Sequence, residues 1–110
     1  MQTTDSPGIC SNILNEIAIC SRHIDVLYAV SRNQPIGIIK LAQQLDLPQH
    51  QIRYSLRILE SYRYIVAGAA GATTPLEPDE LIMTLQAEVE ALIPHIEALV
   101  TRLHNNPHHS

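Results

Sequence analysis

The chain has 110 residues, of which 45% are hydrophobic and 16% are charged, and its formal net charge is −4. This length suits one small domain with its own core, and the composition is too apolar for a disordered chain. No apolar run approaches the roughly 20 residues that span a bilayer, and residues 1–6 carry no Lys or Arg of the kind that opens a secretory signal. We therefore expect a cytoplasmic protein with no membrane partner.

The N-terminal third predicts a helix. Residues 1–8 contain the breakers Pro7 and Gly8 and are expected to form a flexible N-terminus, whereas residues 9–31 contain no Gly or Pro. One long helix and two helices joined near Ser21 both fit the apolar stripe, which consists of Ile13, Ile17, Cys20, Ile24, Leu27 and Tyr28. Pro35 ends this segment, because it disfavours a helical conformation at the residue before it.

The middle of the chain predicts two short helices joined by a tight turn. An apolar-periodic run ends at Leu45, and a second helix is expected over about Pro48–Tyr62, where Ile52, Leu56 and Leu59 recur at i, i+4 and i+7. Pro48 suits the first helical position, and Asp46 can take the left-handed conformation that such a turn requires. Two short helices in this arrangement are the layout of a helix-turn-helix.

A β-hairpin is expected directly after this pair. Residues 65–67 (Ile-Val-Ala) have strand character, residues 68–71 (Gly-Ala-Ala-Gly) can turn, and residues 72–74 (Ala-Thr-Thr) can form the returning strand. A hairpin at this place in a helix-turn-helix protein is a wing. The predicted fold is therefore mainly α with a small β-hairpin, a winged helix-turn-helix over residues 9–75.

The C-terminal region, residues 76–104, predicts a dimerisation helix, followed by a flexible tail over residues 105–110. Apolar residues alternate at spacings of three and four, with β-branched residues and Leu in the two seam positions, a pattern that favours two-stranded pairing. The seam consists of Ile82, Leu85, Val89, Leu92, Ile96, Leu99 and Leu103. Pro94 removes one backbone hydrogen bond, so we expect a kink or a restart there. Residues 9–20 are expected to join the same dimer interface.

The charges are distributed unevenly along the chain. Residues 32–63 hold five of the seven cationic residues and sum to +3, whereas residues 1–31 sum to −2 and residues 64–110 to −5. A local basic face matters more for phosphate contact than the overall charge does. The positive charge therefore coincides with the predicted helix pair.

The outward face of the second helix is the best candidate for a binding surface. His50, Arg53 and Arg57 lie at i, i+3 and i+7 on one stripe. In a major groove, the N-terminal residues of such a helix reach base edges while its arginines meet bases or phosphates. A merely solvated helix face is the alternative, but the place of the stripe in the motif favours DNA. The candidate DNA-binding residues are Gln49, His50, Gln51, Arg53, Tyr54, Arg57, Lys40 and Thr73.

Other chemistries find little support. Cys10 and Cys20 lack CxxC spacing and are expected to be free buried thiols. Cys20 and His23 share a helical face at ligand spacing, but a core Cys and a surface His fit better than a metal site. No Ser/His/Asp set, carboxylate pair or phosphate loop is present, so we expect no enzyme, no cofactor and no metal. No residue pattern indicates an effector pocket.

With these elements in place, the chain resembles the winged helix-turn-helix transcriptional regulators of bacteria and archaea, over about residues 22–103. The resemblance is carried by residues 36–48 and 52–60, in which Ala42, Leu47, Ile52, Leu56 and Leu59 sit at the family's offsets, and it is closest to small regulators that add a C-terminal dimerising helix. Two features depart from the family pattern: Asp46 replaces the commonest glycine, and residues 67–72 carry no Lys or Arg.

The resemblance implies sequence-specific binding of double-stranded DNA by a homodimeric transcriptional regulator. Two recognition helices would then face half-sites about one helical turn apart. The alternative is a winged-helix module that binds a protein partner and no DNA, which the uncharged wing favours.

Overall fold

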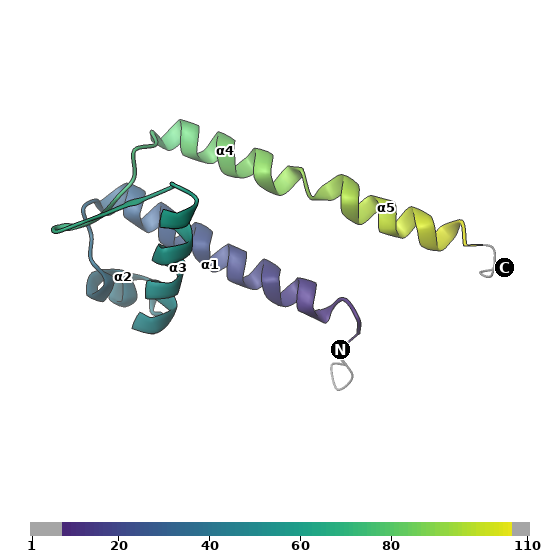
Figure 1. The fold of residues 1–110 in the computed structure, drawn as a ribbon, viewed down its shortest axis with the longest axis horizontal. Coiled ribbons are helices and arrows are strands. Elements are labelled where there is room, and N and C mark those ends of the chain that lie inside the picture. The colour runs from purple at the N-terminus through teal and green to yellow at the C-terminus, as the bar shows by residue number, and fades with distance from the viewer. Residues whose placement is uncertain (1–7, 107–110) are drawn as a thin grey trace. The chain divides into compact units, whose positions relative to one another are not determined.

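The computed structural model describes residues 8–106, so the predictions for residues 1–7 and 107–110 lie outside the described residues. The chain divides into two compact units, Met1–Pro75 and Leu76–Ser110. The first holds α1 (Ser11–Asn33), α2 (Ile38–Leu45), α3 (Gln49–Ser61), β1 (Val66–Gly68) and β2 (Gly71–Thr73), and the second holds α4 (Pro78–Glu90) and α5 (Ile93–His104) (Figure 1). The prediction of a mainly helical fold with a small β-hairpin is confirmed.

Helix α1 is a single continuous helix of 23 residues, and its two halves differ in burial. The C-terminal half supplies the core of the first unit through Val26, Leu27, Ala29 and Val30. In the N-terminal half, the side chains of residues 12–18 are all exposed. Cys10, which directly precedes α1, and Cys20 are exposed free thiols, so the expectation that they are buried is wrong.

Helices α2 and α3 pack on α1 and on each other. The apolar residues that face inward are Leu41 of α2 and Ile52 and Leu59 of α3, each at most 5% exposed. Burial of large aliphatic side chains of this kind contributes roughly 1.5–3 kcal/mol each to folding. The helix pair is therefore fixed to α1 through a continuous apolar layer.

The turn between α2 and α3 has the expected left-handed residue. Asp46 has φ 54° and ψ 49°, and the Leu47 amide donates to the Ala42 carbonyl at 3.1 Å, which satisfies an end group of α2. Pro48 is extended and precedes the first helical residue, so it caps α3 and does not occupy its first turn as predicted. The fixed φ of proline suits both positions.

The hairpin is short and is anchored to the segment before α2. Strands β1 and β2 pair antiparallel, with Gly68 opposite Gly71. Ile36 exchanges backbone hydrogen bonds with Ala72 at 3.2 and 2.8 Å. Gly71 has φ 129°, and a Cβ built there lies 2.6 Å from the Ile36 carbonyl carbon. Only glycine allows the hairpin to approach this segment so closely.

The second unit consists of two helices within the region where a C-terminal helix interrupted at Pro94 was expected. Helix α4 ends at Glu90 and α5 begins at Ile93, with Pro94 in its first turn. Pro94 has no N–H to donate to the Glu90 carbonyl, and its ring disfavours an uninterrupted helix through this point. The break falls at Ala91 and Leu92, which keep right-handed helical dihedral angles, so the predicted restart is observed.

Candidate nucleic-acid interface

Helix α3 presents two chemically distinct faces. Ile52, Ser55 and Leu59 are buried against the rest of the first unit. The predicted DNA-binding residues of this helix are exposed, with one exception: Gln51 is half-buried. The exposed ones are Gln49, His50, Arg53, Tyr54 and Arg57. The inward apolar residues thus fix which side of α3 faces solvent, and the predicted polar stripe lies on that side.

The cationic groups of this surface have no intramolecular partners among the described residues. Arg53 and Arg57 lie one helical turn apart, and neither forms an ion pair or hydrogen bond within residues 8–106. Lys40 of α2 is also exposed and lines a surface hollow together with Gln49 and Arg53. Three side-chain charges are therefore available to anionic groups on one side of the α2–α3 pair.

The hairpin contributes less to this surface. Thr73 is half-buried, and its hydroxyl lies 3.5 Å from the Val66 carbonyl as a donor. Residues 66–74 contain no Lys or Arg. Any contact from the hairpin to an anion must therefore come from backbone N–H groups or from a threonine hydroxyl.

A polar cluster that the sequence analysis did not predict joins α1 to α3. The Ser55 hydroxyl is fully buried and lies 2.8 Å from His23 Nδ1, and Arg22 Nε donates to the same oxygen at 3.2 Å. The Tyr54 ring lies over this pair, 5.7 Å from the His23 ring and 5.9 Å from the Arg22 guanidinium carbon. His23 is therefore packed between helices, and Cys20 is exposed, the reverse of the expected core Cys and surface His.

The surroundings of His23 in this cluster favour its neutral form. Arg22 can only donate, so the Ser55 oxygen accepts that bond and its hydroxyl hydrogen is available to His23 Nδ1. An unprotonated Nδ1 of a neutral imidazole can accept that hydrogen. Burial lowers the pKa of His23 below its ordinary value and the adjacent Arg22 charge lowers it further, while Glu16 acts weakly in the opposite direction.

This cluster should make stability depend on pH. Because the folded pKa of His23 is depressed, the unfolded chain takes up the proton first as the pH falls through 6.5. The contribution of His23 to the free energy of unfolding should therefore be complete above pH 6.5. It should be lost as the pH falls from 6.5 to the folded pKa. Urea denaturation of the wild type and of His23→Gln, which keeps a hydrogen-bonding group without the titration, should give curves that converge as the pH falls. Parallel pH profiles would contradict the role assigned to His23.

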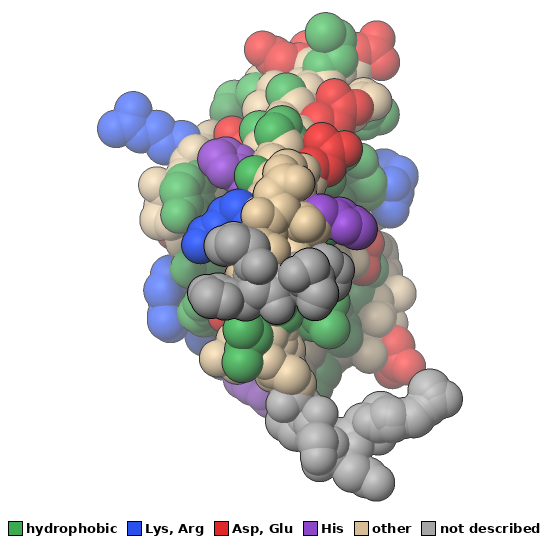
Figure 2. Space-filling model, turned by 90° about the vertical axis from the view of Figure 1, so that its right-hand side faces the viewer, with side chains coloured by type: hydrophobic (Ala, Val, Ile, Leu, Met, Phe, Trp, Pro, Cys, Tyr) green, Lys and Arg blue, Asp and Glu red, His purple; other side chains and the backbone are tan. Residues whose placement is uncertain are grey.

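The predicted seam of the second unit is largely uncovered. Six of its seven members are 44–67% exposed, and Leu85 is half-buried. Met83, Ile93 and Val100 add further exposed apolar side chains. Figure 2 shows hydrophobic side chains at the surface beside acidic ones. In the first unit, the N-terminal half of α1 likewise exposes Ile13, Leu14 and Ile17. Contiguous exposed apolar surface of this kind marks interaction sites.

Other kinds of site receive no support from residues 8–106. No group of three or more His, Cys, Asp or Glu side chains that could hold a metal occurs among them. No helix in this range is long and apolar enough to cross a membrane. Comparison with protein-family models and with curated proteins finds no match for this chain.

Proposed function

We propose that this protein is a homodimeric winged helix-turn-helix regulator that binds double-stranded DNA in a sequence-specific manner. The observation that carries this proposal is the outward face of α3, where Arg53 and Arg57 are exposed without partners among the described residues. The opposite face of the same helix is buried. A helix held in this way presents its polar face outward, as a recognition helix does in a major groove. In this role the protein would act in the cytoplasm.

The stripe along α3 combines residues suited to base contacts with residues suited to phosphate contacts. Gln49, His50 and Gln51 stand at the helix N-terminus, where recognition helices contact base edges. Glutamine amides can make paired hydrogen bonds to adenine, and arginines can do the same to guanine or contact phosphates. Arg57, farther along α3, and Lys40 on α2 are placed to flank the groove as phosphate contacts.

Dimerisation belongs to the same proposal. One subunit offers few cationic groups, so a single recognition helix would bind weakly. Pairing two copies through the α4–α5 seam, assisted by the exposed half of α1, doubles the contacts at little entropic cost for the second site. The two α3 helices would then read half-sites about one helical turn apart.

A salt titration tests DNA binding. Fluorescence anisotropy should be measured with a duplex from the gene's own upstream region and with a random duplex. If Lys40, Arg53 and Arg57 of both subunits contact phosphates, affinity should fall by about a thousandfold between 50 and 200 mM salt. The upstream duplex should bind more tightly than the random one at each salt concentration. Absence of binding at 50 mM would overturn the proposal, and equal affinities would overturn its sequence-specific part.

A protein-binding module is the second candidate. It is favoured by the hairpin, whose residues 66–74 carry no cation, and by the second unit, which carries six acidic residues against Arg102. On this reading the exposed α4–α5 surface binds a different protein and α3 does not contact DNA. The titration separates the two candidates, because a protein-binding module should show no salt-dependent affinity for either duplex.

A further inference from the structure

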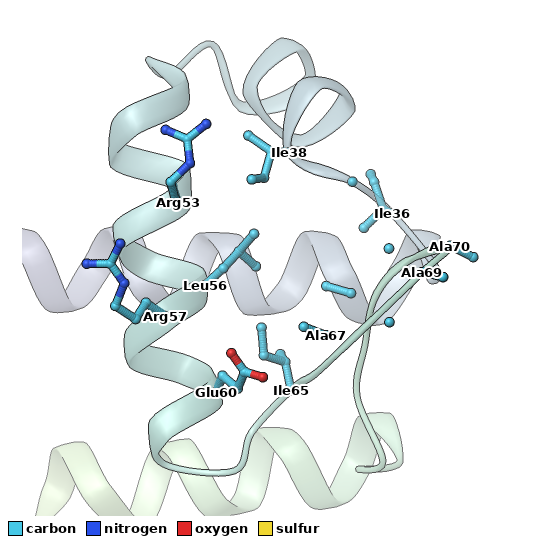
Figure 3. Close-up of a pocket in the computed structure, with 14 residues that line it drawn as sticks. Ile36, Ile38, Arg53, Leu56, Arg57, Glu60, Ile65, Ala67, Ala69 and Ala70 are labelled. Carbon is cyan, nitrogen blue, oxygen red and sulfur yellow. The ribbon is translucent and has the colours of Figure 1, made fainter.

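A hollow of about 500 Å³ lies between α3 and the hairpin. Figure 3 shows its side chains: Leu56 of α3, Ile65 and Ile36 converge on it, and Arg53 and Arg57 flank it along α3. A second hollow shares Ile36, Arg53 and Ala70 with the first and extends toward Lys40. Together they form one groove, hereafter the α3–hairpin groove.

The groove exists because its hairpin wall is built from small residues. Positions 67–72 are occupied only by Ala and Gly, so no long side chain fills the space opposite Leu56. The close approach of Gly71 to Ile36, together with the paired hydrogen bonds between Ile36 and Ala72, fixes this wall in place. The contacts that attach the hairpin to the domain thus also hold the hollow open. Its volume lies within the range of about 300–1,000 Å³ that small-molecule sites occupy.

The lining is apolar in the middle and charged at its ends. Ile36 and Ile65 are 3% exposed and form a rigid floor. At one end Arg53, together with Lys40 beyond it, is available to an anion. At the other end the Arg57 guanidinium points away from the hollow in Figure 3, whereas the Glu60 carboxylate lies beside the hollow and repels an anion there. An anionic group therefore belongs at the Arg53 end, with an apolar body extending over Leu56 and Ile65.

We propose that the α3–hairpin groove binds a small apolar monocarboxylate and that this ligand releases DNA. A phosphate backbone can satisfy Arg53, but it cannot fill the apolar floor, whereas an acid with a hydrocarbon body does both. Regulation of DNA binding rests on the proposed function, in which Arg53 contacts DNA. A ligand carboxylate at Arg53 competes with DNA for the same guanidinium group. Ligand binding itself does not depend on it, since the groove is formed by the first unit alone.

Octanoate is a suitable probe. Acetate is the matched control that lacks the apolar body, and 1-octanol is the matched control that lacks the charge. Nuclear magnetic resonance spectra of the full, DNA-free chain should be recorded during titration with each compound. Octanoate should produce saturable shifts at the amides of Ile36, Leu56 and Gly71. Acetate should not, and octanol should bind about tenfold more weakly, the loss expected for one charge-assisted contact. Absence of localised shifts with octanoate, or equal binding of octanol, would overturn the proposal.

Variants separate the groove from DNA binding. Ala67→Leu should fill the hollow and weaken octanoate binding by about tenfold or more, a loss comparable to that of one strong contact, while Ala87→Leu on α4 should leave it unchanged. Ala67 is not a proposed DNA contact, so the Ala67→Leu variant should still bind DNA but should no longer be released by octanoate. Release by octanoate that persists in this variant would overturn the regulatory step. Failure of the wild type to bind DNA would leave the octanoate titration as an independent test of the site.

Discussion

Replacement of both Arg53 and Arg57 by alanine is expected to abolish DNA binding at physiological salt while the domain stays folded. The two side chains are exposed and make no hydrogen bond or ion pair within residues 8–106, so the folded state loses little. The proposed dimer would lose four contacts to DNA. At about 1 kcal/mol for each contact, the affinity should fall by about a thousandfold. The slope of log affinity against log salt should decrease in magnitude by about 3.6 if all four contact phosphates.

The matched control is the double variant Arg32→Ala/Arg102→Ala, which removes the same charge elsewhere. Arg32 lies over the Tyr28 ring at 6.0 Å in α1, and Arg102 lies in the last turn of α5, so neither belongs to the α3 stripe. Anisotropy titrations at three salt concentrations should show near wild-type affinity for the control. Equal losses in the two double variants would mean that overall charge and not the α3 surface governs binding.

Much of the first unit could be predicted because its signals are local. A short stretch of sequence predicts the left-handed conformation of Asp46 and the burial of Ile52 and Leu59, and the structure confirms both. The Gly-Ala-Ala-Gly turn at residues 68–71 is likewise a local signal. The predicted helix ends were less accurate. The fixed φ of proline suits the position before a helix as well as its first turn, so the sequence does not distinguish these two places for Pro48.

The polar cluster of Arg22, His23 and Ser55 could not be read in the same way, because its partners lie 32 and 33 residues apart. One signal was present. Ser55 occupies an inward position between Ile52 and Leu59, and a buried hydroxyl requires a hydrogen-bond partner. Which residue supplies that partner depends on how α1 crosses α3, which a single sequence does not specify.

The α3–hairpin groove was missed for a related reason. Each residue of its hairpin wall reads as an ordinary turn or strand residue. The hollow arises only when Gly71 meets Ile36, 35 residues earlier in the chain, and leaves the small side chains opposite Leu56. Spacing along the sequence predicts which residues share a face of a helix or strand. A cavity depends instead on the sizes of side chains that face each other across it from distant parts of the sequence.

The exposed seam on α4 and α5 is not explained by DNA binding through α3, and the proposed dimer would cover it. Apolar residues in this pattern gain from a second copy of the same surface, since β-branched and Leu positions alternate in the way that two-stranded pairing favours. Full burial of a Leu or Ile side chain contributes roughly 1.5–3 kcal/mol, and each half-exposed seam residue would gain part of that amount on pairing. On our proposal, the seam residues of both subunits together offset the cost of association.

If the proposed dimer forms through this seam, Leu92→Asp should convert it to a monomer and thereby weaken DNA binding by well over tenfold. Leu92 is 54% exposed and immediately precedes α5. A carboxylate at that place favours the helix N-terminus, so loss of the dimer would not reflect unfolding of α5. The charge would instead lie unpaired in the apolar interface, which is strongly unfavourable. Sedimentation and anisotropy should be measured on the same samples.

Ala91→Asp provides the control, because it places the same charge one residue earlier, outside the seam. It should remain dimeric and bind DNA as the wild type does. If both variants stay dimeric, the α4–α5 seam is not the interface, and the exposed half of α1 becomes the surface to test. If Leu92→Asp is monomeric but binds DNA with unchanged affinity, the two α3 helices do not act together and the dimer is not part of recognition.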